Sequence, residues 1–294
     1  MTLKYLPIFA IAMTTASAAT AQGVEYLSYG ANYTNLSVDG NDANLLSLGA
    51  SVDFRVNDAF INGAISYTDV SGDGGDGSIT GISTRGGYFV APQAVIYGGL
   101  NYVDTSDSDS LNTYNVGAEY AFNAFTVGLN YDDSEQSGYP ETTTLYAGYQ
   151  ASDAVEIAVG VSDTDGENTA QVSFDFDNGQ YDVSALYVGA DGLNLFGFDA
   201  AYNFGNGFRT SGSYVSLDGD ADILSIGGGY EVSQDMWVDL EVGRFNADGG
   251  GSADVIELAL TYEMGRETLL VDRMESTQIE ALGVLGQIAE LGGF

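Results

Sequence analysis

The sequence predicts an all-β fold, a transmembrane antiparallel up-and-down β-barrel of about 16 strands followed by a short C-terminal amphipathic helix. Three observations lead to this prediction. Apolar and polar residues alternate from Val24 to Met264, turn-forming residues interrupt the alternation at regular intervals, and the apolar positions are rich in aromatic residues. This pattern is typical of tilted strands that cross a bilayer with one apolar face and one polar face.

The alternation has a period of two, which places successive side chains on opposite faces of a strand. In residues 46–55, Leu46 and Val52 lie on the apolar face, and Ser47 and Asp53 lie on the polar face. Sixteen such segments begin near Val24, Asn44, Ala59, Ser78, Gln93, Leu111, Ala124, Thr142, Val155, Asn168, Gln180, Leu193, Gly207, Asp222, Met236 and Ala253. Residues 22–264 allow about 15 residues for each strand with its connection, which suits strands of roughly ten membrane-spanning residues.

The connections are predicted to be of two kinds that alternate along the chain. Tight turns with Asn, Asp or Gly, such as those at residues 56–59, 122–124 and 177–179, follow the even-numbered strands. Longer acidic loops, such as those at residues 71–77 and 132–140, follow the odd-numbered strands. Aromatic residues gather near both kinds of connection, as expected for two membrane interfaces. They lie at Phe54, Phe60, Tyr88, Phe122, Phe125, Tyr149, Phe176, Tyr181, Phe204, Phe208 and Tyr230 beside the turns, and at Tyr33, Tyr67, Tyr102, Tyr131 and Tyr187 near the loops.

A secreted β-sandwich or β-solenoid is the alternative fold, because a soluble sheet also alternates apolar and polar residues. Sixteen hairpin-linked strands, an even number, and an apolar face rich in aromatic residues favour the barrel.

The first 21 residues are predicted to be a cleaved signal peptide that exports the chain. Lys4 is followed by a short apolar run, and small residues lead to an A-x-A pattern that ends at Ala21, with cleavage after Ala18 as the alternative. Removal of this segment takes away the only lysine and no acidic residue, so the formal charge changes from −35 to −36.

The composition excludes most kinds of catalytic and binding site. The chain has no His and no Cys, so imidazole bases, disulfides and thiolate zinc sites are absent, and its charge of −35 argues against nucleic-acid partners. Acidic loops at residues 71–77, 104–109 and 163–167 carry oxygen ligands suited to calcium, but none has the EF-hand spacing with its closing glutamate. We therefore expect no enzyme activity, no cofactor and no specific metal site.

The signal peptide, the sixteen strands, the tight turns and the acidic loops resemble those of Gram-negative outer-membrane porins, in particular the acidic porins of alphaproteobacteria. The resemblance covers residues 22–264 and rests on this pattern. It implies a barrel in the outer membrane, in contact with its lipid, that passes small hydrophilic solutes and cations by passive diffusion and assembles as a homotrimer. The sequence departs from the family pattern in lacking a loop long enough to fold into the lumen, and in carrying about 30 residues after the last strand.

The polar face would then line the pore. Its predicted pore-lining charged residues are Asp53, Arg55, Arg85, Glu119, Glu156, Asp175, Asp182, Asp199, Arg209, Glu231, Asp239, Glu241 and Glu257. Seven of the acids lie three or four residues from a tight turn and would form an acidic ring near the periplasmic end: Asp53, Glu119, Glu156, Asp175, Asp182, Glu231 and Asp239. A ring of carboxylates favours cations, so we predict moderate cation preference. Alternatively, these carboxylates only solvate the lumen and pair with Arg55 and Arg209.

From Gly265 onwards the period changes, which predicts a different element over residues 265–294. Apolar residues spaced four and three apart indicate an amphipathic helix, and they are Leu270, Met274, Thr277, Ala281, Val284, Ile288 and Leu291. This helix would lie in the periplasm or at the barrel mouth, as a plug, a trimer-forming stalk or a strap along the membrane. A polar lumen disfavours a deep plug, so self-association is the favoured role. If the helix and inward side chains do block the lumen, the alternative function is a structural or adhesive barrel whose acidic external loops are the working surface.

Overall fold

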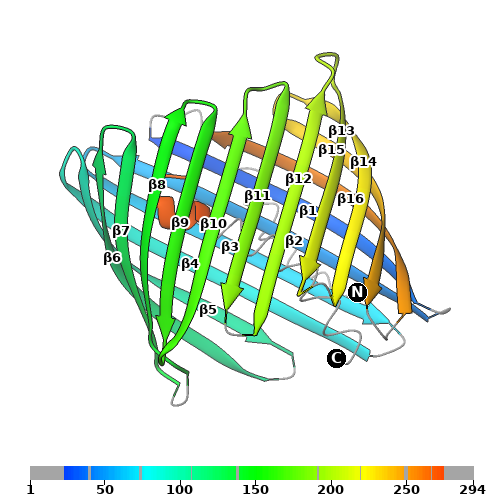
Figure 1. The fold of residues 1–294 in the computed structure, drawn as a ribbon, viewed down its shortest axis with the longest axis horizontal. Coiled ribbons are helices and arrows are strands. Elements are labelled where there is room, and N and C mark those ends of the chain that lie inside the picture. The colour runs from blue at the N-terminus through cyan, green and yellow to red at the C-terminus, as the bar shows by residue number, and fades with distance from the viewer. Residues whose placement is uncertain are drawn as a thin grey trace.

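The computed structural model describes residues 23–38, 41–72, 75–106, 108–136, 139–190, 192–218, 220–247, 251–265 and 267–274, and within these residues sixteen strands form one closed antiparallel barrel (Figure 1). The strands are β1 (Val24–Val38), β2 (Asn41–Val56), β3 (Ala59–Gly72), β4 (Gly75–Ala91), β5 (Ala94–Thr105), β6 (Ser108–Phe122), β7 (Phe125–Ser134), β8 (Thr142–Ser152), β9 (Val155–Thr164), β10 (Glu167–Asp177), β11 (Tyr181–Ala190), β12 (Leu193–Asn203), β13 (Phe208–Leu217), β14 (Ala221–Ser233), β15 (Met236–Ala247) and β16 (Gly251–Gly265). Each strand pairs with its neighbours in sequence, and β1 closes the barrel against β16. The predicted fold class and strand number are confirmed.

The alternation of the sequence appears directly in the exposure of the side chains. Leu145, Ile226 and Leu240 point outward and are 63%, 64% and 54% exposed, whereas Asp53 and Asp239 point inward and are 0% and 7% exposed. Exposed Leu, Ile, Val, Phe and Tyr side chains occur on most of the strands. In water such a surface would be a large aggregation-prone patch, but a bilayer would bury it.

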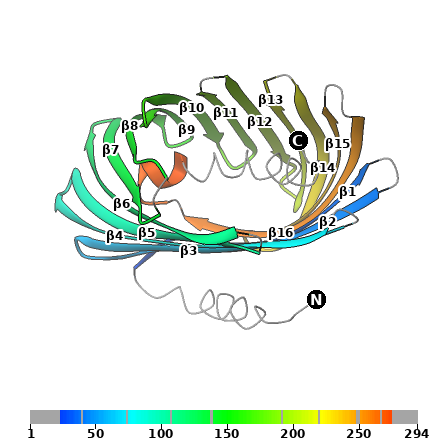
Figure 2. The same ribbon diagram turned by 90° about the horizontal axis from the view of Figure 1, so that it is seen from below.

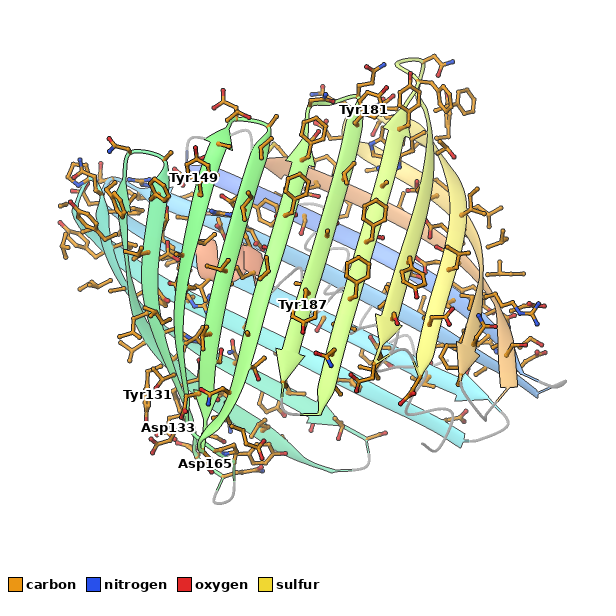
Figure 3. All side chains as sticks on the ribbon, viewed as in Figure 1. Tyr131, Asp133, Tyr149, Asp165, Tyr181 and Tyr187 are labelled. Carbon is orange, nitrogen blue, oxygen red and sulfur yellow. The ribbon has the colours of Figure 1, made fainter. Side chains whose placement is uncertain are left out.

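Aromatic side chains lie near both rims of this outer surface. Figure 3 shows Tyr149 and Tyr181 near the rim formed by the tight turns, and Tyr131 toward the opposite rim. Tyr149 and Tyr181 are 40% and 47% exposed. One aromatic residue predicted for this surface lies elsewhere: Phe60 is 2% exposed and packs inside the barrel, next to the ring of Phe89.

The predicted difference in length between the two kinds of connection is largely wrong. The strands extend into the predicted acidic loops, so only two residues separate β1 from β2, β3 from β4, and β9 from β10, as in the tight turns. The longest connection joins β7 to β8 and comprises seven residues. Strand ends that stand outside a bilayer need no apolar face, so the loss of alternation there does not mark the end of a strand. In the tight turns Asn57, Asn123 and Asp235 have positive φ, a conformation that Asn and Asp tolerate.

The last strand ends at Gly265, as predicted, with a φ of 82°. The chain then turns inward, and residues 270–274 form a single helical turn enclosed by the barrel wall (Figure 2). No helix in the described ranges is long and apolar enough to cross a membrane. The predicted signal peptide and the remainder of the predicted C-terminal helix, residues 275–294, lie outside the described residues.

Candidate functional site inside the barrel

The predicted pore-lining residues fall into separate environments inside the barrel. Asp53, Arg85, Glu119 and Glu156 are at most 8% exposed and lie against the C-terminal segment, residues 267–274. A second set, from β11, β12, β15 and β16, lines a water-accessible cavity in the other half of the lumen and consists of Asp182, Asp199, Glu241 and Glu257. The remaining five predicted residues belong to neither set, and they are Arg55, Asp175, Arg209, Glu231 and Asp239.

Two carboxylates of the first set hold the backbone of the C-terminal segment. Asp53 accepts a hydrogen bond of 2.6 Å from the backbone N–H of Thr268, and Glu119 accepts one of 3.1 Å from the N–H of Val271. The N–H of Val271 lies in the first turn of the helix, where such groups lack an intrahelical partner and a carboxylate is a favourable acceptor. Asp53 also accepts a bond of 2.5 Å from the side-chain amide of Asn62, which fixes the carboxylate on the wall.

Ion pairs add to this attachment. The guanidinium of Arg273 donates two hydrogen bonds, of 3.0 and 3.1 Å, to the two oxygens of Glu156, and this fork geometry is the strongest form of the pair. Arg85, on β4, forms an ion pair with Asp272, and both side chains are less than 10% exposed. The segment and the wall therefore carry complementary charges at two points.

The inner wall offers the segment an apolar seat beside these polar contacts. The buried apolar residues of this cluster are Phe60, Val95, Tyr97, Tyr146 and Ala158 from the wall, and Leu269, Leu270, Val271 and Met274 from the segment. Leu269 and Leu270 are each 1% exposed. The expectation that a polar lumen disfavours a segment inside the barrel is thus wrong for residues 267–274, because the wall is apolar where they pack.

Glycines shape the seat by bringing backbone and side chain close together. A Cβ built on Gly148 would lie 2.7 Å from Cδ2 of Leu270, so only glycine leaves room for that leucine. Tyr146 lies over Gly128 in a similar way, and its hydroxyl donates a 2.9 Å hydrogen bond to Glu119. The Tyr97 hydroxyl lies 2.9 Å from that of Tyr146, so the two rings and the carboxylate form one buried chain of hydrogen bonds.

The second set of acids surrounds a cavity of about 380 Å³. Its lining includes Asp182, Asp199, Glu241 and Glu257 together with serines, and no basic residue belongs to the described lining. Glu241 accepts hydrogen bonds of 2.6 and 2.8 Å from serine hydroxyls, and Glu257 accepts one of 2.7 Å from the side-chain amide of Asn32. Asp182 and Asp199 are exposed to the lumen.

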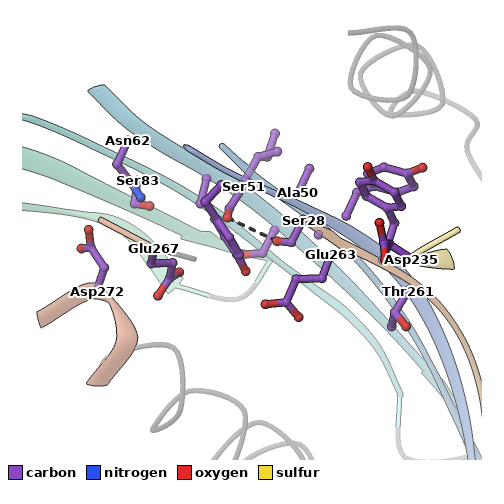
Figure 4. A pocket seen from close by; sticks show the side chains of 18 of the residues that line it. Ser28, Ala50, Ser51, Asn62, Ser83, Asp235, Thr261, Glu263, Glu267 and Asp272 are labelled. Carbon is purple, nitrogen blue, oxygen red and sulfur yellow. Dashed lines mark hydrogen bonds between the residues drawn. The ribbon is translucent and has the colours of Figure 1, made fainter. Parts of the chain in front are cut away.

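A larger cavity of about 570 Å³ is lined by residues of β1 to β4, of β13, β15 and β16, and of the C-terminal segment (Figure 4). Asn62 and Ser83 line it from the wall, and Asp272 lines it from the helical turn. Ser28 and Ser51 also line it, with their hydroxyls 3.3 Å apart. The segment therefore leaves polar space beside it.

The basic residues predicted to neutralise the lumen have specific partners. Arg209 donates hydrogen bonds of 2.6 and 2.5 Å to the two oxygens of Asp239, and its guanidinium lies 4.4 Å from the ring of Trp237. The guanidinium of Arg55 lies 3.7 Å from a carboxylate oxygen of Glu25 and stacks on the ring of Phe89. Neither of these two partners is a predicted lumen acid.

The two remaining acids lie at the same rim as the tight turns. Glu231 accepts a hydrogen bond of 3.2 Å from the backbone N–H of Asp235, and Asp175 lies half-buried opposite Glu156 in the register of β9 and β10. Among the described residues there is no group of three or more Asp or Glu side chains arranged to hold a metal ion.

Sequence reasoning missed the apolar seat, although the sequence carries a signal for it. Val95-Ile96-Tyr97 is apolar on both faces of its strand, so the alternation fails there. Ile96 is 52% exposed on the outside, and Val95 and Tyr97 are 5% and 4% exposed on the inside. Such a run indicates a strand that packs against something on its inner side.

Comparison with solved structures identifies the fold as that of outer-membrane porins. OpdQ of Pseudomonas aeruginosa has a TM-score of 0.54 and 10% sequence identity, covering 83% of this chain and 99% of its own. OccK7 (OpdD) of the same organism gives 0.52 and 10%, covering 82% and 98%, and a multiply substituted Rh. blastica porin gives 0.50 and 12%, covering 81% and 99%. No protein-family model and no curated protein matches the chain. At 10 to 12% identity the likeness shows a shared fold.

Proposed function

We propose that the protein is a porin of the outer membrane, through which small hydrophilic solutes and ions diffuse passively. The exposed apolar outer surface and the polar cavities inside the barrel support this proposal, as does the fold shared with porins. Passive diffusion requires water-filled space and no catalytic residue. The proposed pathway runs past the two cavities, beside the C-terminal segment, and no step needs a cofactor.

The acidic cavity carries the proposal of cation preference. Asp53, Glu119, Glu156 and Asp239 are held by protein partners, whereas the second set of acids lines a cavity whose described lining contains no basic residue. Asp182 also lines a neighbouring cavity with Arg209, whose guanidinium is paired with Asp239. At about 8 Å in water a carboxylate attracts a monovalent cation by roughly 0.5 kcal/mol, which physiological salt reduces to roughly 0.2 kcal/mol. Four such carboxylates favour a cation over an anion by roughly 1.5 kcal/mol, or about tenfold.

Conductance of the refolded protein in a planar bilayer, with a salt gradient, tests both parts of the proposal. Stepwise openings with a cation-favouring reversal potential are expected. The double variant Asp199→Asn/Glu241→Gln removes half of the acidic cavity's charge and should lower the cation-to-anion permeability ratio by about threefold. Asp222→Asn/Asp254→Asn removes the same charge from the outer face and should leave the ratio unchanged.

An unaltered ratio in the first double variant would refute the assignment to these carboxylates. One observation favours a second candidate function, because the C-terminal segment occupies part of the lumen. A folded and inserted barrel that passes no current would therefore support a structural or adhesive role, with the external loops as the working surface.

Export through a signal peptide at residues 1–21 and assembly as a homotrimer complete the proposal. An amino-terminal sequence of the mature protein that begins near residue 22 would support the export signal. The mass of the detergent-solubilised barrel measures the number of subunits, and a monomeric mass would contradict the trimer.

A further inference from the structure

A second apolar surface lies on the inner wall, away from the seat of residues 267–274. We call it the apolar belt. It consists of Leu36, Leu45, Leu186, Val188, Leu195, Val215, Ile223, Phe245, Ala253 and Val255. These residues come from β11 to β16 and from β1 and β2, and they lie toward the end of the barrel opposite the tight turns. Cross-strand pairs such as Val188 with Leu195 and Ile223 with Phe245 make the belt continuous.

The belt is far more buried than the strands alone explain. Its members are at most 9% exposed, and Leu195 is completely buried. On β14 Ile223 faces inward and is 4% exposed, while its neighbour Leu224 faces outward and is 60% exposed. Concavity of the wall does not account for this, because the inward Ser213 and Ser225, two residues from belt positions on the same strands, are only half-buried. Apolar side chains facing a water-filled lumen need a cover in front of them.

The chain leads directly to the belt. The carbonyl of Met274 accepts a 3.0 Å hydrogen bond from the side-chain amide of Gln171 on β10. Gln171 is paired in register with Val188, the first belt residue on the next strand. Twenty residues follow Met274, and as a helix they would be about 30 Å long, close to the roughly 34 Å spanned by eight adjacent strands.

The sequence of these twenty residues matches the belt in chemistry. An apolar stripe with spacings of three and four continues from Met274 through Thr277, Ala281, Val284, Ile288 and Leu291. Such a stripe buries one helical face against an apolar partner.

We propose that residues 275–294 lie inside the barrel as a helix packed along the apolar belt, with residues 267–274 as its anchor on the neighbouring wall. This inference goes beyond the proposed channel function and does not depend on it, because its test reads thiol chemistry and not current.

Disulfide trapping in the full-length chain tests the contact, and the absence of native cysteine makes every introduced thiol unambiguous. Seven residues of helix span about 10 Å, which is two strand spacings, so Ala281 should lie abreast of β12. Under mild oxidation the pair Ala281→Cys/Leu195→Cys should form an intrachain disulfide in the folded barrel. The control pair Ala281→Cys/Phe196→Cys, whose second thiol faces outward, should not. Disulfides between chains through Ala281→Cys would overturn the proposal in favour of a self-associating stalk.

Thiol accessibility gives an independent measurement that does not require disulfide geometry. Leu195→Cys in the otherwise natural chain should react slowly with a hydrophilic maleimide. Adding Val284→Asp/Ile288→Asp, which places charge on the stripe, should raise the labelling rate at least tenfold while the barrel stays folded. Ser276→Asp/Gln287→Asp adds the same charge off the stripe and should not. Rapid labelling of Leu195→Cys with the natural tail would show that the belt has no cover and would overturn the proposal.

Discussion

Replacement of Leu270 by alanine should loosen the C-terminal segment from the barrel wall. Leu270 is 1% exposed and fills the space left by Gly148 within the apolar seat. Truncation of a fully buried leucine to alanine costs about 2–5 kcal/mol, because apolar burial is lost and a cavity remains. The segment is a small unit attached to a much larger barrel, so the cost falls on docking of residues 267–274 and not on the barrel itself.

Hydrogen exchange of the backbone amides of Thr268 and Val271 measures this docking, since both donate to buried carboxylates. At the low end of the estimate, about 2 kcal/mol, the Leu270→Ala variant should exchange these amides about 30-fold faster. Leu145→Ala makes the same truncation on β8 at a side chain that is 63% exposed on the outer face, and it should leave both rates unchanged. If these two amides exchanged at the same rate in Leu270→Ala and in the natural protein, the conclusion that apolar contacts hold the segment on the wall would be refuted.

Three further predictions follow from the same contacts and charges. Gly148→Ala should accelerate hydrogen exchange of the same two amides, because its Cβ would meet the buried side chain of Leu270. Gly160→Ala should have less effect, since the nearest atom to its Cβ would be the flexible end of Met274, 2.8 Å away. Arg273→Gln should weaken docking of residues 267–274 by roughly 2–3 kcal/mol, because Glu156 loses its bidentate partner. The same hydrogen exchange measures this loss, and an equally large effect of Arg273→Lys would count against the fork geometry. Raising the salt from physiological strength to 1 M shortens the screening length from about 8 Å to about 3 Å, so the cation preference in reversal-potential measurements should fall toward none, and a preference independent of salt would contradict its electrostatic origin.

The sequence contained enough information to predict the barrel, because strand period and turn chemistry are local properties. Apolar and polar residues alternate from Leu46 to Arg55. In the structure Asp53 points inward and Val52 and Phe54 point outward, as this alternation predicts. Loop length was not predictable in this way. Residues 71–77 lack alternation, yet the strands continue through most of them, since a strand in water is under no pressure to keep one apolar face.

The interior was only partly predictable, because parity gives the direction of a side chain and not its partner. Glu119 and Asp199 share the inward face, but Glu119 is buried against Tyr146 and the N–H of Val271, whereas Asp199 faces a cavity. Nothing in the local sequence of either strand shows that a segment more than a hundred residues away supplies the partner of Glu119. The apolar run at Val95-Ile96-Tyr97 is a local signal that the inner wall carries a packing surface, and Leu186-Tyr187-Val188 on β11 is a second one.

The division of the acids into two sets explains how one lumen can carry so much negative charge. In the half that holds the C-terminal segment, Asp53 and Glu119 accept hydrogen bonds from backbone N–H groups and Glu156 pairs with Arg273, so these carboxylates are stabilised and the segment is fixed in place. In the other half the acids line a cavity, where in the proposed channel water would screen them and leave them able to attract passing cations. An anchored segment on one wall and unpaired charge facing the cavity on the other would confine permeating ions to the acidic side. The lumen would therefore select by charge without an inward-folded loop, because residues 267–274 occupy the wall opposite the acidic cavity. The helix proposed along the apolar belt would lie on the acidic side, toward the end of the barrel away from the tight turns.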